Sequence, residues 1–350
     1  MYQLRELCFE ITNKCYANCI FCSTFDDIKR RKGSEEISFE IIVRVISEFK
    51  RLGGQKLEIS GGEPLLHSRI LDIVGYALEN DIEVVIYTSG ILNNTRAFQN
   101  TINQLASIGL KKIVFNCQGL GNTHNFLLGK RSAFDKLIDT IQYCRDYLDL
   151  WIGIHFVPCK RNYFEVKSLY NYLSRLAIDE FAILRLVKQG RAKRYWSELS
   201  MDKSDYLKLF EDLRTLLSQK TRPFIGLGHP LDFIMKILYK DYKSHKTCHA
   251  GKFSLDIMVN GDVVPCPAFK DIRIAKVGNI FEDFLEHIWI NSRFLKELRN
   301  LDISKIEVCN SCSFREICNG GCVAQRLIEN KSIVAGPDPL CKLLNIHQRR

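Results

Sequence analysis

The chain has 350 residues, 46% of them hydrophobic, and a formal charge of +10, so it can bury one large core or two smaller ones. The opening MYQLREL lacks the apolar core of a signal peptide, and no run of 18 apolar residues follows, so we expect a cytoplasmic protein without a membrane partner. Fourteen cysteines in a reducing compartment favour metal binding or catalysis over disulfides wherever they cluster.

Six strand-then-helix units are predicted over the first 220 residues, each a short apolar run followed by an amphipathic stretch of helical period. The predicted strands are 7–12, 56–60, 83–90, 112–116, 150–158 and 181–187. The predicted helices are 38–54, 68–80, 95–107, 133–147, 163–177 and 203–219, the first with Ser38 as N-cap and Gly53 as its stop. Repeated units of this kind predict an α/β fold, a parallel sheet curled into a partial (β/α)6 barrel like a TIM barrel.

Three cysteines follow the first predicted strand, in the stretch EITNKCYANCIFC. Cys15, Cys19 and Cys22 have the spacing CxxxCxxC, which lets one loop wrap three corners of an iron–sulfur cluster and leaves one iron without a thiolate. Structural zinc sites close with four ligands, so three from one loop favour iron–sulfur chemistry, with a zinc half-site as the alternative. In a parallel barrel, loops at the C-terminal ends of strands carry the chemistry, and this loop is the first of them.

The composition and pattern of the sequence change after about residue 225, at the glycine- and proline-rich stretch RPFIGLGHPLDF. We expect a barrel domain over 1–225, a linker over 226–245 and a second domain over 246–350. The second domain holds seven cysteines, Cys248, Cys266, Cys309, Cys312, Cys318, Cys322 and Cys341. Because it has few long helical patterns, metal binding can stabilise it in place of core burial.

These two patterns resemble the radical S-adenosylmethionine (radical SAM) enzymes that carry a SPASM extension. The first matches the signature CxxxCxΦC, with Phe21 as the aromatic Φ, and the second supplies all seven SPASM cysteines. The resemblance implies that Cys15, Cys19 and Cys22 bind a 4Fe–4S cluster whose open iron chelates S-adenosylmethionine (SAM). An electron from that cluster then cleaves SAM to a 5′-deoxyadenosyl radical.

The resemblance also implies two auxiliary iron–sulfur clusters of the 4Fe–4S type in the second domain. One would be held by Cys309, Cys312, Cys318 and Cys341, and the other by Cys248, Cys266 and Cys322. No further cysteine lies between Cys248 and Cys266. The second auxiliary cluster therefore has an open iron, a different nuclearity or a ligand other than cysteine.

A SAM-binding segment is expected at EISGGEP, which ends the second predicted strand. It supplies Gly61, Gly62, Glu63 and Pro64. The glycines permit close backbone approach, and Glu63 or nearby carbonyls can accept a hydrogen bond from an ammonium group. By the resemblance this segment cradles the methionine amino group, and polar residues at later strand ends contact the ribose or carboxylate. The candidates at those ends are Thr88, Ser89, Asn116, Gln118, Arg185 and Arg191.

The remaining cysteines and basic runs carry weaker expectations. Cys117 and Cys159 lie near the predicted barrel mouth and are candidates for giving a hydrogen atom to a substrate radical. Cys8 and Cys144 are expected to be small buried hydrophobes, and His155 is expected to pack inside the barrel. The runs DDIKRRKG and KQGRAKR are candidates for an acidic-peptide path, with solvated surface as the ordinary alternative.

SPASM enzymes mostly modify ribosomally made peptides, so the resemblance implies a maturase that crosslinks or otherwise oxidises peptide side chains. Its partners would be a precursor peptide and a flavodoxin- or ferredoxin-type reductant. Because the first strand begins by residue 7, leader binding would fall to a separate protein or a bare groove. Pro267 stands where sulfatase maturases carry an acidic proton acceptor, which disfavours that activity.

Three alternatives remain open at this point. A small-molecule dehydrogenase or epimerase acting on a sugar or amino alcohol would share every cysteine. A zinc-binding nucleic-acid module would fit the positive charge but would leave the barrel motifs unexplained, so we expect no nucleic-acid partner. An electron-transfer protein would hold iron without cleaving SAM.

Overall fold

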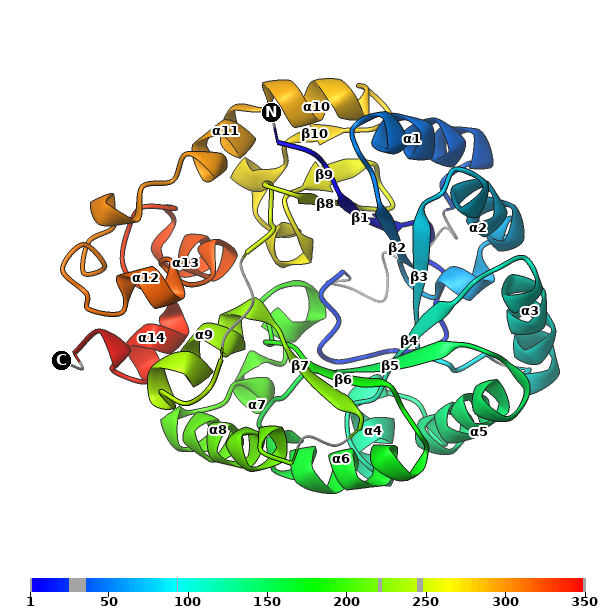
Figure 1. The fold of residues 1–350 in the computed structure, drawn as a ribbon, viewed down its shortest axis with the longest axis horizontal. Helices are drawn as coiled ribbons and strands as arrows, with labels where there is room; N and C mark the ends of the chain where they lie inside the picture. Colours follow the sequence, from blue (N-terminus) through cyan, green and yellow to red (C-terminus); the bar gives the residue numbers. More distant parts are fainter. Residues whose placement is uncertain (1, 25–35, 93, 220–221, 244–247, 349–350) are drawn as a thin grey trace.

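The structure, a computed structural model, describes residues 2–24, 36–92, 94–219, 222–243 and 248–348. The run DDIKRRKG lies outside the described residues. One curved sheet forms the centre, with helices around its outside (Figure 1). Within the described part of the chain the strand order is β10-β9-β8-β1-β2-β3-β4-β5-β6-β7. The strands are β1 (Glu6–Glu10), β2 (Lys56–Ser60), β3 (Glu83–Thr88), β4 (Lys112–Asn116), β5 (Trp151–Phe156), β6 (Glu180–Ile183), β7 (Phe224–Leu227), β8 (Ser254–Ile257), β9 (Asp262–Val264) and β10 (Gly278–Asn279).

Neighbouring strands from β8 through β1 to β7 are parallel, and β9 and β10 add an antiparallel edge. The barrel helices are α1 (Phe39–Arg51), α2 (Ile70–Glu79), α3 (Thr95–Ser107), α4 (Gly121–Leu128), α5 (Ala133–Tyr147), α6 (Val166–Arg175), α7 (Trp196–Leu199), α8 (Lys203–Leu217) and α9 (His229–Leu238). The later helices are α10 (Leu285–Asn291), α11 (Arg293–Arg299), α12 (Arg315–Cys318), α13 (Val323–Asn330) and α14 (Pro339–Leu343). The predicted α/β fold with a barrel-like parallel sheet is confirmed.

The described part of the segment predicted as a linker, 226–243, instead holds the end of strand β7 and all of helix α9. Its glycines serve packing rather than a break in the fold. A Cβ on Gly226 would lie 2.5 Å from the Glu180 Oε1 on the neighbouring strand β6, so a larger residue there would displace the Glu180 side chain. Pro230, the second of two prolines in the same stretch, stands in the first turn of α9, where its missing N–H costs nothing.

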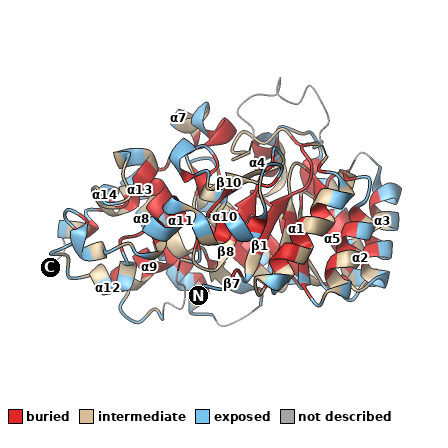
Figure 2. Cartoon of the chain, turned by 90° about the horizontal axis from the view of Figure 1, so that it is seen from above, coloured by how far each residue is buried: buried red, intermediate tan, exposed pale blue. Residues whose placement is uncertain are grey.

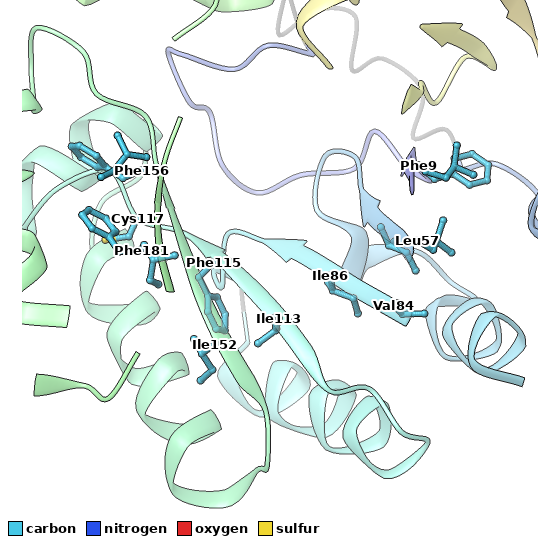
Figure 3. Packing of buried hydrophobic residues seen from close by; sticks show 14 of the residues in the cluster. Phe9, Leu57, Val84, Ile86, Ile113, Phe115, Cys117, Ile152, Phe156 and Phe181 are labelled. Carbon is cyan, nitrogen blue, oxygen red and sulfur yellow. The ribbon is translucent and has the colours of Figure 1, made fainter. Parts of the chain in front are cut away.

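Alternation along the strands divides the core into an outer layer and a lumen. Residues such as Phe9, Leu57, Ile86, Ile113 and Phe115 face the helices and form the large apolar cluster between sheet and helices (Figure 3). Residues between them in the sequence, such as Glu10, Glu58 and Asn116, face the inside of the curved sheet. The inner face is therefore polar while the outer face is apolar, and buried residues concentrate along the sheet (Figure 2).

The C-terminal module is attached directly to the barrel, because its first strand β8 pairs with β1 in parallel register, Glu6 opposite Ser254 and Cys8 opposite Asp256. The module also has a small apolar core of its own around Phe269, Phe294 and Leu327. Cys144 lies in the main core and Cys8 is buried, 3.6 Å from the Ser60 hydroxyl. None of the described helices combines the length and apolar character that crossing a membrane requires.

Candidate active site

The three-cysteine loop leaves the C-terminal end of β1 and is fixed by backbone hydrogen bonds to its neighbours. Gly62 N donates to Thr12 O at 2.7 Å, and Glu63 N donates to Lys14 O at 2.6 Å. On the other side, loop amides donate to the end of α4, Asn18 N to Leu128 O at 2.8 Å. The loop therefore lies across the ends of several barrel strands, as the sequence predicted.

Four glycines line the places where other segments approach this loop. A Cβ on Gly61 would lie 2.4 Å from Thr12 O, and one on Gly62 would lie 2.2 Å from Lys14 O. A Cβ on Gly129 would lie 2.7 Å from Asn18 O, and one on Gly190 would lie 2.6 Å from Cys22 O. Real Cβ atoms do not approach backbone oxygens so closely, so each position requires glycine. The loop path is thus set by close backbone contact on both sides.

The thiols of this loop gather around Cys19. Burial raises the pKa of the Cys19 thiol well above its usual value, and the neighbouring Cys22 and Cys15 raise it further, while Arg191 opposes the shift. Arg191 is itself buried, and its Nη1 donates to Cys19 O at 2.7 Å. Its Nε and Nη2 find no acceptor in the described part of the chain. Three thiols and an unpaired buried cation form a set that fits a negatively charged cluster.

Glu63 organises the neighbouring strand end. Its carboxylate accepts hydrogen bonds from the Thr88 hydroxyl at 2.7 Å, the Ser89 hydroxyl at 2.6 Å and the Ser89 amide at 2.9 Å. Burial raises the pKa of Glu63, and these donors oppose the shift. Thr88, Ser89 and Glu63 were predicted separately as SAM contacts; the structure brings them together, with Pro64 buried beside them in the next turn. Contact of these side chains with SAM stays a prediction.

Asn116 and Gln118 meet at the ends of β4 and β5. The Gln118 amide nitrogen donates to Asn116 Oδ1 and, at 3.1 Å, to His155 O, and its Oε1 accepts from Val157 N at 2.9 Å. Gln118 is fully buried, so it ties the strand ends together. The His155 ring lies inside the barrel beside Tyr87, with ring centroids 4.9 Å apart.

Phe21 lies over two small apolar clusters, one of which contains Cys159, Leu127 and Leu186. It therefore anchors the cysteine loop, whatever its relation to SAM. Cys159 is 2% exposed, and burial raises the pKa of its thiol to about 11. A role for Cys159 as hydrogen donor stays a prediction.

The expectation for Cys117 is corrected by the structure. Its side chain lies in the main core on the outer face of the sheet, near Phe156 and Phe181 (Figure 3). It is fully enclosed, and its Sγ donates to Gly119 O at 3.6 Å. The physical reason is strand alternation, because Cys117 continues the outward-facing series Ile113 and Phe115. A thiol on this face cannot reach a substrate in the lumen.

The seven later cysteines form two spatial groups. Burial raises the pKa of Cys266, and Cys248 and Cys322 raise it further, so these three thiols are neighbours. Burial likewise raises the pKa of Cys318 to about 11, with Cys309 and Cys312 adding to the shift. The pKa of Cys341 is raised to about 12 by burial, then by Cys318 and Cys309 among its neighbours. The membership of these groups is that of the two ligand sets implied by the resemblance, and their binding of clusters stays a prediction.

Single-ion sites and iron–sulfur clusters differ in how closely their ligands stand. Among the described residues, no three His, Cys, Asp or Glu side chains converge tightly enough to hold one metal ion. Four thiolates on one zinc, each about 2.3 Å from the metal, must lie within about 4 Å of each other. Cluster ligands bind different irons and stand further apart.

Arg185 connects the barrel to the auxiliary cysteines. Its Nη1 donates to both carboxylate oxygens of Asp338, at 2.7 and 2.8 Å, and both side chains are almost fully buried. Asp338 also accepts from Cys322 N at 2.9 Å and Leu340 N at 2.7 Å. Arg185 is thus engaged at the auxiliary cysteines, and its expected contact with SAM stays a prediction.

A buried charged group inside the barrel was missed by the sequence reasoning. Lys270, from the C-terminal module, pairs with Glu10 at the end of β1 and lies 3.6 Å from Asp256 on β8. The Thr24 hydroxyl, just past the cysteine loop, donates to Glu10 at 2.8 Å. Burial raises the pKa of Asp256 to about 6, although Lys270 opposes the shift. The available signal was Glu10 itself, a charge at an inward position directly before the loop.

The fold and these thiol groups define a class, an α/β-barrel iron–sulfur enzyme. Residues 9–171 match the Radical SAM superfamily, and residues 248–313 match the SPASM iron–sulfur cluster-binding domain. The chain therefore carries a radical SAM domain followed by a SPASM domain. Its cofactors are accordingly SAM and iron–sulfur clusters.

Three curated relatives span most of the chain. PqqA peptide cyclase of Bradyrhizobium diazoefficiens is 25% identical over 343 residues, covering 97% of this chain and 86% of the relative. Mycofactocin maturase MftC of Mycobacterium tuberculosis is 26% identical over 339 residues, covering 96% and 82%. Fe-coproporphyrin III synthase of Methanosarcina barkeri is 23% identical over 341 residues, covering 89% and 81%.

Among solved structures, SuiB of Streptococcus suis bound to its precursor peptide SuiA has the same fold. Its TM-score is 0.78 at 23% identity, with 97% of this chain and 76% of SuiB covered. The structure named anSMEcpe with bound AdoMet has a TM-score of 0.73 at 17% identity, covering 98% and 91%. At these identities the likeness establishes the fold.

Proposed function

We propose that this protein is a radical SAM enzyme that abstracts a hydrogen from a ribosomally made peptide. The outcome is an oxidative crosslink, thioether or carbon–carbon, or a related side-chain modification. Two of the relatives named above are a peptide cyclase and a maturase, and the solved SuiB structure contains a precursor peptide. These names support a peptide substrate here.

In this proposal each group of cysteines holds one cluster. Cys15, Cys19 and Cys22 hold the SAM-binding 4Fe–4S cluster. Cys309, Cys312, Cys318 and Cys341 hold one auxiliary cluster, and Cys248, Cys266 and Cys322 hold the other. SAM held at the first cluster would supply the radical chemistry, and the auxiliary clusters would supply an electron acceptor or an anchoring point for substrate.

The main observation behind the proposal is how the three-cysteine loop is held in place. Backbone contact at Gly61, Gly62, Gly129 and Gly190 fixes the loop without any side chain between. The unpaired nitrogens of Arg191 beside Cys19 supply positive charge where a cluster of thiolates and sulfides would lie. An ordinary turn would need neither feature.

The remaining residues position groups and exclude water. Glu63, held by Thr88 and Ser89, presents fixed carboxyl oxygens beside the glycine segment, suited to accept hydrogen bonds from an ammonium group. Glu10, Lys270 and Asp256 fill the lumen below the loop with fixed charges. Such preorganised groups keep the reacting atoms close and bulk water out.

The partners proposed with this function are a precursor peptide and a flavodoxin- or ferredoxin-type reductant. A separate leader-binding protein is a further proposed partner. The small-molecule alternative is favoured by one relative, which is named as a coproporphyrin synthase rather than a peptide maturase.

The activity is tested by SAM cleavage under dithionite in anaerobically reconstituted protein. The wild-type protein should release 5′-deoxyadenosine, and replacement of Cys15, Cys19 and Cys22 by alanine should abolish release while the auxiliary iron remains. Cys144→Ala, in the core on α5, is the matched control and should cleave SAM normally. Cleavage retained by the triple variant would contradict the proposed cluster site.

The substrate class needs a separate experiment. Deuterium from a labelled candidate peptide should appear in 5′-deoxyadenosine, and the peptide should lose two hydrogens by mass spectrometry. Deuterium transfer from a free sugar or amino alcohol, with peptides unchanged, would favour the small-molecule alternative instead.

A further inference from the structure

Arg326 is a fully buried arginine whose guanidinium makes no hydrogen bond within the described part of the chain. Its side chain is 0% exposed, and none of Nε, Nη1 and Nη2 has an acceptor among the residues that the structure describes. Charged side chains are almost never fully buried without a partner. Burying an unpaired cation costs several kcal/mol, by general experience with buried ions. The position therefore calls for a negatively charged group that protein atoms do not supply.

The surroundings of the guanidinium are cysteine thiols. Arg326 lies on α13, one helical turn after Cys322, which is the N-cap of that helix. Helical side chains lean toward the N-terminus, which aims this one back at the cysteines. Cys309, Cys318 and Cys322 are within electrostatic reach of the guanidinium. Its Cζ also lies 3.7 Å from the place where a Gly320 Cβ would be, between Cys318 and Cys322 in the sequence.

The neighbouring carboxylate of Asp338 does not pair with the arginine. Asp338 is also within electrostatic reach of Arg326, but its oxygens already accept from Arg185, Cys322 N and Leu340 N. Arg326 makes no hydrogen bond to it. The neighbouring thiols belong to both auxiliary groups, two to the four-cysteine group and one to the three-cysteine group.

We infer that Arg326 is a positioning residue between the two auxiliary clusters, whose N–H groups donate to cluster sulfur and make the four-cysteine cluster easier to reduce. The inference rests on the proposed ligand sets. One-electron reduction adds a negative charge to a cluster and changes no other bond. A fixed cation with hydrogen-bond donors stabilises that charge, so it raises the reduction potential.

The test is a redox titration of the auxiliary clusters followed by electron paramagnetic resonance. It uses the variant in which Cys15, Cys19 and Cys22 are alanine, so that the signals come from the auxiliary clusters alone. Arg326→Met removes charge and donors at similar size, and Arg326→Lys keeps the charge but loses the planar fork of donors. Arg293→Met is the matched control, since its side chain is 93% exposed in the same module.

In Arg326→Met the ratio of reduced to oxidised four-cysteine cluster at a fixed potential should fall at least tenfold, which is 59 mV for one electron. Arg326→Lys should show a smaller fall, and Arg293→Met none. Arg326→Met with full auxiliary iron and the midpoint of the control would overturn the inference. If that variant loses auxiliary iron, Arg326→Lys decides by the same criterion.

A measurement on the unaltered protein gives a second decision. With ¹⁵N-labelled arginine, spin-echo spectra of the reduced auxiliary cluster should show a ¹⁵N coupling that Arg293→Met keeps and Arg326→Lys loses. Absence of this coupling in the wild-type protein would overturn the inference while leaving SAM cleavage, and the proposed function, intact. Wild-type protein without auxiliary iron would contradict the ligand sets themselves.

Discussion

Arg185 and Asp338 stand 153 positions apart in the sequence and meet in a buried ion pair, with Nη1 2.7 Å from one carboxylate oxygen and 2.8 Å from the other. The Asp338 carboxylate also accepts hydrogen bonds from the backbone N–H of Cys322 and from that of Leu340, the residue before Cys341. The pair therefore joins the loop after β6 to the cysteine-bearing module.

Arg185→Met should lower the free energy of unfolding by about 3–5 kcal/mol, because it leaves the buried Asp338 carboxylate unpaired. Denaturant unfolding followed by tryptophan fluorescence measures this. The double variant Arg185→Met with Asp338→Leu should recover part of the loss. The exposed pair of Arg161 and Glu198, 3.0 Å apart, is the control, and Arg161→Met should cost under about 1 kcal/mol. Equal losses in the free energy of unfolding for the two arginine variants would show that the buried ion pair contributes no more to stability than the exposed one.

Gly61→Ala and Gly62→Ala should each reduce SAM cleavage at least tenfold. The new Cβ would meet Thr12 O or Lys14 O, and Gly61 also has a φ of +141° that disfavours alanine. The cysteine loop must then shift, at a cost of about 1–3 kcal/mol in strain. Gly75→Ala, on α2 with nothing within 4 Å of the new Cβ, should be neutral or stabilising by up to about 1 kcal/mol. Release of 5′-deoxyadenosine measures the first effect, and normal release from Gly61→Ala would refute it.

Cys117→Ala should leave product formation unchanged and lower stability by about 1 kcal/mol, a common size for a core substitution. The reason is its place in the apolar layer outside the sheet, away from the lumen. Cys159→Ala tests whether the other candidate thiol, Cys159, donates a hydrogen atom. If Cys159 gives a hydrogen atom to the substrate radical, its variant should still consume SAM but lose product; otherwise it should behave as Cys117→Ala does.

His124 should make stability depend on pH below neutrality. It is fully buried, its Nδ1 accepts from Gln118 N at 3.0 Å, and burial lowers its pKa to about 3. The unfolded chain takes up a proton below pH 6.5 that the folded state refuses, so this stability is present above pH 6.5 and falls as pH decreases. From pH 7.5 to 5.5 the loss from this group is about 1.4 kcal/mol.

The check is urea unfolding of wild type and His124→Asn at both pH values, since Asn keeps an acceptor near the place of Nδ1. The variant should be less stable at pH 7.5 but should lose about 1.4 kcal/mol less on acidification. Gly75→Ala, which removes no titratable group and places a Cβ with nothing within 4 Å, should keep the wild-type slope. An unchanged slope in His124→Asn would mean that another group carries the proton uptake.

Local patterns in the sequence were sufficient to predict the repeated barrel units. The helices at 95–107 and 133–147 have the predicted bounds, because their apolar faces repeat at helical period. Ser38 does stand at the N-cap of α1, although its side chain makes no capping hydrogen bond. The short helix α4 was not predicted, since its eight residues begin at a glycine and have little amphipathic pattern.

Long-range relations were beyond the reach of such patterns. The pairing of β8 with β1 joins residues about 250 positions apart, and four residues of SLDI give no sign of their partner. Charged residues such as Lys270 and Arg326 are expected on the surface from the sequence alone. In the structure both are buried, Lys270 beside Glu10 and Arg326 beside the auxiliary cysteines. For the site, the sequence predicted Glu63, Thr88 and Ser89 as three separate contacts, whereas they are one hydrogen-bonded unit.

The pairing of β8 with β1 also bears on attempts to shorten this protein. A fragment that stops before β8 would present the strand leading into the cysteine loop as a bare rim, with unsatisfied amides and carbonyls along one side. Exposed edge strands pair with edge strands of other molecules, so the fragment should self-associate and bind its iron poorly. The C-terminal module therefore protects the edge of β1, the strand that leads into the cysteine loop, in addition to carrying cysteines of its own.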